Sequence, residues 1–125
     1  MDQNTVLIVG SIALDSIETP SDKRTNVIGG STTYSLIAAS RFSKTSIVGI
    51  VGSDFPKEGL KLYETYADNL EDLKINEGST FRWGGKYHSN WDDRDTLYTD
   101  LGVFLDFNPV PVSYTHLRAH ETGCY

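Results

Sequence analysis

The segment TVLIVGSI, residues 5–12, is the stretch that decides the fold. It is continuously apolar and β-branched rather than alternating, a pattern typical of a strand that is covered on both faces. The residues that follow, 13–30, contain two half-polar strand candidates around a turn formed by Pro20, Ser21 and Asp22. The sequence therefore predicts a central strand of an α/β sheet, followed by a two-stranded excursion that leaves this sheet.

Helix and strand patterns alternate in the next part of the chain. A helix is predicted over 31–43, because Ser31 or Thr32 can cap it and its apolar residues follow helical spacing. TSIVGIVG, residues 45–52, is a second continuously apolar strand, and a second helix is predicted over 57–70. The order strand–helix–strand–helix indicates a parallel sheet with right-handed crossovers.

Beyond residue 70 the pattern changes to short strands. LKI (73–75), TFRWGGKYH (80–88) and TLYTDLGVFLDF (96–107) are strand-like, and their aromatic residues suit a half-buried antiparallel layer. We therefore expect an α/β protein with a parallel core and separate antiparallel strands. Two or three parallel strands with two helices would leave strand faces and an edge open, so we also expect poor stability.

Composition excludes several classes of partner. The net charge of −6 argues against binding to nucleic acid or to an anionic membrane, because phosphates are repelled on average. The amino-terminal apolar run is too short to span a bilayer and lacks a basic region before it, so it makes a poor signal peptide. A single cysteine among 125 residues suggests a reducing compartment. We expect a cytoplasmic protein.

Three neighbouring features form the candidate ligand site: Asp15 beyond the first strand, the Gly29–Gly30 pair, and the helix that starts after this pair. An aspartate can accept hydrogen bonds from two hydroxyls of a polyol, and paired glycines allow the backbone to approach a ligand closely. Ligands of open α/β sheets bind at the carboxyl ends of the strands. Each feature alone is more often an ordinary strand end or turn.

Taken in this order, residues 5–110 resemble the amino-terminal half of the PfkB, or ribokinase-like, carbohydrate kinases. The resemblance is carried by VLIVGSIALDSI, NVIGGSTTYSLIAASRF and SIVGIVGSDFP, which end at Ile17, Phe42 and Pro56. It implies a ribokinase-like fold with an incomplete parallel α/β core and an antiparallel β lid. It also implies that Asp15, Gly29 and Gly30 contact the substrate, and that Gly52 and Asp54 form the Gly-x-Asp turn with which the family's next strand ends.

The family resemblance implies transfer of the γ-phosphoryl group of ATP, with Mg²⁺, to a hydroxyl of a sugar or related polyol. The family's catalytic base lies in a Gly-Ala-Gly-Asp-type segment, and this chain contains neither a Gly-x-Gly-Asp nor a Walker-type phosphate loop. We therefore expect no catalytic residue here and no kinase activity of these residues alone. Where many relatives have a sugar-contacting asparagine, this chain has Tyr34, which could stack on a ring. Arg82 is expected to reach the substrate cleft from the lid.

Three alternatives stay open at this point. Tyr34 leaves a nucleoside kinase of the same fold as a candidate. A non-catalytic module would bind a sugar, or form a homodimer through the lid. Dinucleotide binding is disfavoured, because only Gly10 of a Gly-x-Gly-x-x-Gly fingerprint is present after the first strand.

No metal site is predicted. The aspartates around Arg94 lack the glycine and distal glutamate of an EF-hand loop, and His88 has no ligand-spaced partner. His116, His120 and Cys124 have helical spacing, but the tail that contains them resembles translated adapter or vector DNA. We therefore divide the chain into a kinase-like part, residues 1–110, and a non-native tail, residues 111–125.

Overall fold

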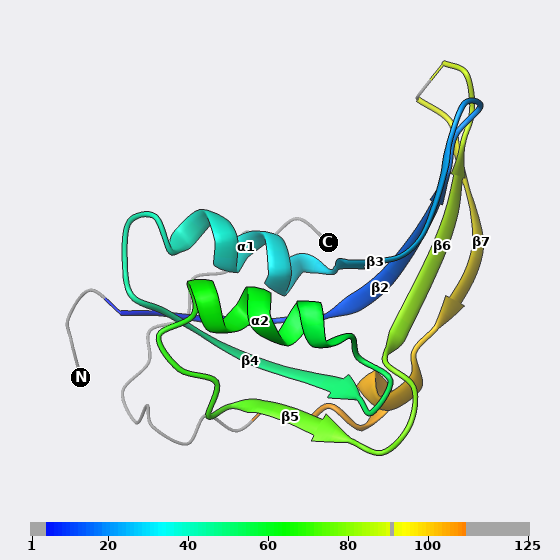
Figure 1. Cartoon of the computed structure of the whole chain (residues 1–125). Helices are drawn as coiled ribbons and strands as arrows, with labels where there is room; N and C mark the ends of the chain where they lie inside the picture. The colour runs from blue at the N-terminus through cyan, green and yellow to red at the C-terminus, as the bar shows by residue number, and fades with distance from the viewer. Residues whose placement is uncertain (1–4, 91, 110–125) are drawn as a thin grey trace.

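The computed structural model describes residues 5–90 and 92–109, which form two β-sheets (Figure 1). The first sheet is three-stranded with the order β1-β4-β5, and the second is four-stranded with the order β3-β2-β6-β7. The strands are β1 (Val6–Val9), β2 (Ala13–Glu18), β3 (Lys23–Gly29), β4 (Thr45–Gly52), β5 (Leu73–Asn76), β6 (Phe81–Tyr87) and β7 (Arg94–Asp100). The helices are α1 (Ser31–Ala39) and α2 (Lys57–Tyr66), followed by the 3₁₀ helix η1 (Gly102–Asp106).

The first sheet is parallel throughout and forms the core of the protein. Val6 pairs with Thr45 and Gly49 with Leu73, so β4 is the central strand. All eight residues of β4 are buried, as its continuous apolar sequence predicts. Helices α1 and α2 lie on one side of this sheet in Figure 1. The strand–helix–strand order in the sequence thus gives the parallel sheet that we predicted.

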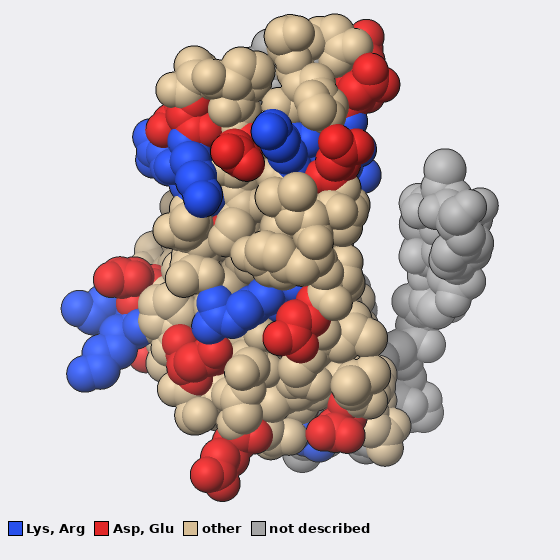
Figure 2. Space-filling model, turned by 90° about the vertical axis from the view of Figure 1, so that its right-hand side faces the viewer, with Lys and Arg blue, Asp and Glu red and all other residues tan. Residues whose placement is uncertain are grey.

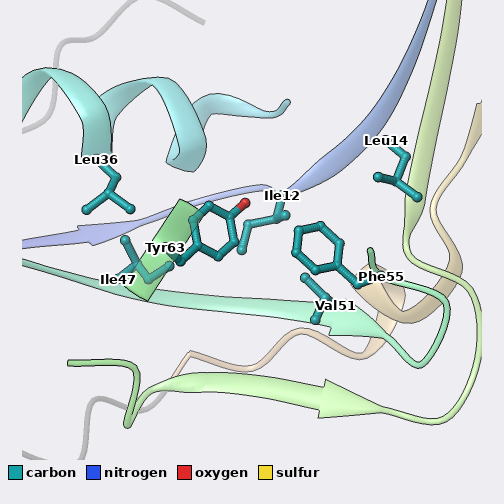
Figure 3. Packing of buried hydrophobic residues seen from close by; sticks show 7 residues of the cluster. All are labelled: Ile12, Leu14, Leu36, Ile47, Val51, Phe55 and Tyr63. Atoms are coloured by element: carbon teal, nitrogen blue, oxygen red, sulfur yellow. The ribbon is translucent and has the colours of Figure 1, made fainter. Parts of the chain in front are cut away.

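Buried side chains from both helices meet the sheet in one apolar cluster (Figure 3). Leu36 of α1 and Tyr63 of α2 are fully buried there, against Ile47 and Val51 of β4. The ring of Phe55 stacks on that of Tyr63 at a centroid distance of 5.7 Å. Burial of side chains of this size contributes about 1.5–3 kcal/mol each to folding.

The second sheet is the lid, which rises away from the core in Figure 1. It begins directly after β1, because the residues between Val9 and Ala13 carry the chain from one sheet into the other. Strand β2 pairs with β3 in antiparallel fashion and with β6 in parallel, and β6 pairs with β7 in antiparallel fashion. The predicted two-stranded excursion after the first strand is therefore confirmed as β2 and β3.

The structure corrects five local expectations, of which the first is that α1 ends at Ala39 rather than at residue 43. The first strand ends at Val9 rather than residue 12, and α2 ends at Tyr66 because the backbone of Ala67 is extended. LKI does not join the antiparallel layer, since β5 pairs in parallel with β4 and extends the core sheet. The apolar run after β7 is not strand: Gly102 takes a φ of +51° and starts η1. His116, His120 and Cys124 lie outside the described residues, as does the whole of the predicted tail, residues 111–125.

Candidate functional site

The chain passes between core and lid twice, from β1 into β2 and from β3 into α1, and these two passages bring the predicted site residues together. Asp15 lies on β2, and Gly29 at the end of β3 pairs with Ala13. Gly30 precedes the first residue of α1, whose Thr32 amide donates to the carbonyl of Ser11 at 3.0 Å. Asp15, the glycine pair and the start of α1 therefore surround one place in the structure, as the sequence predicts.

The carboxylate of Asp15 is packed against the glycine pair. A β-carbon on Gly29 would collide with Asp15 Oδ2, so the observed position of the carboxylate requires glycine at residue 29. Burial raises the pKa of Asp15 above its usual value, and a hydrogen bond from the Gly30 amide partly offsets this rise. The site therefore holds a partly desolvated carboxylate, which binds hydroxyl donors more strongly than one in bulk water.

Gly30 has a backbone conformation that other residues rarely adopt. Its φ is +87°, and a β-carbon would lie 2.5 Å from the carbonyl oxygen of Ser11. The two glycines are therefore required for different reasons: Gly29 for the space beside Asp15, and Gly30 for its φ and its close approach to the chain leaving β1.

A buried hydrogen-bond chain connects the glycine pair to the core. The hydroxyl of Thr33 donates to the Gly29 carbonyl at 2.8 Å and lies 2.7 Å from the hydroxyl of Tyr63. Since the Thr33 proton is used on Gly29, the Tyr63 hydroxyl is the donor to Thr33. Burial raises the pKa of Tyr63 to about 12. Through Thr33, Tyr63 of α2 thus helps to hold the backbone of Gly29 in place.

Next to Asp15 and Gly30 lies an open pocket with a volume of about 390 Å³. One side of it is the lid face formed by alternate residues of β2 and β6, and the other is the start of α1. Its chemistry comes from one carboxylate, one guanidinium and four aromatic rings, namely Asp15, Arg94, Tyr34, Phe81, Trp83 and Tyr87. A pocket of this type can hydrogen-bond a hydroxyl at one end and stack against a flat ring at the other.

Trp83 and Arg94 form the lid wall of this pocket. The indole ring lies over Gly85, where a β-carbon would collide with it, and the Arg94 guanidinium lies 5.3 Å from the ring centroid. The sequence placed Trp83 in a half-buried layer and Arg94 in a polar connection, and neither was predicted at the site. Strand alternation could have indicated this position, however. Phe81, Trp83 and Tyr87 are separated by even numbers of residues, so their side chains lie on the same face of β6.

Tyr34 and Arg82 differ in their relation to the pocket. Tyr34 lines it from α1, with its side chain 59% exposed and its hydroxyl close to Gly29. Arg82 was expected to reach the cleft, but its guanidinium bonds to Asp54 at 2.6 Å and to Asn26 at 2.7 Å and is not among the pocket's lining residues. The reason is strand alternation: Phe81 and Trp83 face the pocket, so Arg82 faces away from it.

Charges of both signs are interspersed on the lid side of the molecule. Figure 2 shows Lys and Arg next to Asp and Glu there, with an uncharged band between two charged groups.

His88 is 2.8 Å from the carboxylate of Asp95, and the described residues contain no group of three or more potential metal ligands. None of the helices in the described part is long and apolar enough to cross a membrane.

Comparison with known proteins gives one curated relative and many solved structures. The chain is 25% identical over 115 residues to a cytidine kinase of Thermococcus kodakarensis, covering 91% of this chain and 40% of that protein. A ribokinase of Cryptococcus neoformans bound to ADP superposes with a TM-score of 0.67 at 17% identity, over 94% of this chain and 39% of that one. A Burkholderia thailandensis nucleoside kinase bound to inosine gives 0.65 at 17% identity, over 81% and 38%.

No family model matches the sequence. The chain spans about two fifths of the length of the curated relative that it matches. At 17% identity these two solved structures, a ribokinase and a nucleoside kinase, are similar to this chain in fold. The described part of the chain has the ribokinase-like fold, an α/β core with a β lid, which its sequence motifs predict.

Proposed function

We propose that this chain is the substrate-binding part of a PfkB-type, ATP-dependent phosphotransferase that acts on a hydroxyl of a sugar or related polyol. The observation that carries the proposal is the partly buried Asp15 carboxylate, held by the Gly30 amide beside Gly29 at the edge of an open pocket. A carboxylate in this position can bind two hydroxyls of one ligand and so orient a third hydroxyl for phosphorylation.

A nucleoside is the second candidate substrate, and the aromatic lining of the pocket favours it. Tyr34, Trp83 and Tyr87 offer ring faces that a sugar alone would leave partly uncovered, whereas a nucleobase can stack on them. The similarity to a cytidine kinase and to an inosine-bound nucleoside kinase supports the same choice. In this reading Asp15 binds the ribose hydroxyls, and the aromatic rings hold the base.

ATP and Mg²⁺ are the cofactors that the family implies, and the residues of this chain do not fit them. The sequence has no Gly-x-Gly-Asp segment and no Walker-type loop, and the pocket's charged groups are one carboxylate and one guanidinium. We therefore assign no residue here to phosphoryl transfer. The expected activity of this chain alone is ligand binding without ATP turnover.

Titration calorimetry with the purified chain tests this proposal, using ribose, fructose, cytidine and inosine as ligands. We expect at least one of them to bind, and Asp15→Ala to abolish the heat of binding, because the pocket loses the one carboxylate among its described lining residues. Glu64→Gln is the matched control, since Glu64 is an exposed carboxylate on α2 outside the pocket. Equal binding by the Asp15 variant and the wild-type chain would contradict the proposal, as would ATP hydrolysis stimulated by any of these ligands.

A further inference from the structure

Arg82 links three segments that are distant in the sequence. It extends from β6 on the lid face opposite the pocket, and its two terminal nitrogens have different acceptors. One donates to Asn26 Oδ1 on β3 at 2.7 Å, and the other donates to Asp54 Oδ2, in the turn after β4, at 2.6 Å. Because β2 lies between β3 and β6, the Arg82 side chain spans the middle of the lid.

The carboxylate of Asp54 is itself fixed by Thr80, the residue that precedes β6. Its other oxygen, Oδ1, accepts hydrogen bonds from the Thr80 amide at 2.9 Å and the Thr80 hydroxyl at 2.7 Å. That hydroxyl also accepts from the Gly52 amide at 2.9 Å, and Thr80 is fully buried. Asp54, in the turn after the core strand β4, therefore contacts the start of the lid strand β6 with both oxygens, one through Thr80 and the other through Arg82.

This ion pair differs from an ordinary surface pair in its surroundings. The Arg82 and Asp54 side chains are 28% and 31% exposed, whereas those of Arg24 and Asp22 at the lid hairpin are 75% and 60% exposed. A planar guanidinium can serve two acceptors in fixed directions, and a lysine ammonium cannot reproduce that geometry. The pair is thus suited to hold β6 in a fixed position relative to the turn after β4.

The opposite face of β6 at this point is the pocket wall. Trp83 follows Arg82 directly, and strand alternation turns its indole ring toward the pocket. A tether on Arg82 therefore also restricts the place of Trp83, one residue away on the same backbone. We propose that Arg82, held by Asp54 and Asn26, is a positioning residue that sets the lid wall of the ligand pocket. The ligand part of this inference rests on the proposed function.

Intrinsic fluorescence of Trp83 tests the inference without any ligand. The sequence has two tryptophans, so Trp91→Phe leaves Trp83 as the reporter in an otherwise unchanged chain. In this background we expect Arg82→Met to raise the acrylamide quenching constant of Trp83 roughly twofold, because the lid strand opens locally more often. Arg82→Lys should give an intermediate value. Arg24→Met, which removes the exposed lid arginine, is the matched control and should leave quenching unchanged.

A double-mutant cycle separates positioning from general loss of structure. Asp54→Asn should reproduce the rise in quenching, and the double variant should add little to either single change, since both remove the same contact. Asp54→Asn keeps an acceptor oxygen for Thr80, so it removes the contact with Arg82 with little effect on the rest of the turn. It therefore still tests the inference if Arg82→Met fails to fold. Unchanged quenching in Asp54→Asn, or fully additive effects in the cycle, would overturn the inference.

Ligand affinity provides the second readout. We expect the dissociation constant for the best ligand among cytidine, inosine and ribose to rise about tenfold in Arg82→Met, as small displacements of a binding wall have effects of this order. An unchanged dissociation constant together with increased quenching would overturn the role in the pocket. If the wild-type chain binds none of these ligands, the proposed function fails, while the Trp83 measurements still decide whether Arg82 positions the lid.

Discussion

The hydrogen-bond chain from Tyr63 through Thr33 to Gly29 allows one prediction to be worked out in full. We consider two single changes that each remove a hydroxyl from a fully buried contact: Tyr63→Phe and Thr33→Val. Tyr63→Phe removes a donor, and the Thr33 hydroxyl keeps its bond to Gly29. The expected cost in the free energy of unfolding is about 1 kcal/mol, the usual net value of one hydrogen bond.

Thr33→Val is expected to cost more, although it also removes only one hydroxyl. It deletes the bond to the Gly29 carbonyl and leaves the buried Tyr63 hydroxyl without its acceptor. A lost hydrogen bond and an unsatisfied buried donor together give about 2–4 kcal/mol. In the double variant the orphaned hydroxyl is gone as well, so it should be more stable than Thr33→Val alone.

Alkaline pH gives an independent check of the burial of the Tyr63 hydroxyl. The pKa of Tyr63 is about 12 in the folded chain against an ordinary value of 10.0 for tyrosine, so the folded state favours the neutral phenol. This contribution to stability is fully present below pH 10 and is lost as the pH rises from 10 to 12. A difference of about 2 pKa units corresponds to roughly 2–3 kcal/mol. Tyr63→Phe should abolish this part of the pH dependence.

Urea unfolding followed by circular dichroism measures these free energies for the wild-type chain and the three variants. A parallel series at pH 9 to 12 measures the alkaline effect. The reasoning is refuted if Thr33→Val is no less stable than Tyr63→Phe, or if the double variant is less stable than Thr33→Val. Either result would mean that the Tyr63 hydroxyl does not depend on Thr33 for its acceptor.

Three further predictions concern the site and its supports. Asp15→Asn should raise the free energy of unfolding at pH 7, since burial disfavours the ionised carboxylate, and it should weaken ligand binding. Thermal unfolding and a ligand titration of this variant measure the two effects. A variant less stable than the wild-type chain would contradict the prediction. Gly30→Ala should destabilise the chain by about 1–3 kcal/mol because of its φ of +87°, which urea unfolding measures; wild-type stability would argue against this. Burial disfavours the ionised form of Asp54, but hydrogen bonds from Thr80 and Arg82 outweigh it and lower its pKa. Its stabilisation is therefore complete above pH 3.8 and lost as the pH falls through the lowered value, and Asp54→Asn should show a shallower acid unfolding curve.

The sequence predicted the parallel core because its information there is local. A continuously apolar strand such as β4 has to be covered on both faces, and the glycine pair before α1 marks where the chain turns. The placement of Asp15 beside Gly29 follows from the hairpin, which is also a short-range feature. These elements could be read from neighbouring residues alone.

What could not be predicted depends on contacts between distant residues. Arg82 was placed on the correct strand, yet its partners Asp54 and Asn26 are 28 and 56 positions away. Strand β5 has only four residues, and nothing in LKI distinguishes a parallel edge strand from an antiparallel one. The run after β7 is apolar, as a buried strand would be, and the conformation of Gly102 decides for η1. The assignment of the substrate residues and of the tail after residue 110 remains a prediction.

The two glycines in the middle of β6 have a consequence for the thickness of the lid. The ring of Trp83 lies over Gly85, while the ring of Tyr98 from β7 lies over Gly84. With no side chain on either glycine, each ring rests directly on peptide groups. At this point the inner and outer surfaces of the lid are separated by a single layer of backbone. A substitution or a contact that displaces Tyr98 therefore presses on the same few peptide bonds that support the tryptophan at the ligand side.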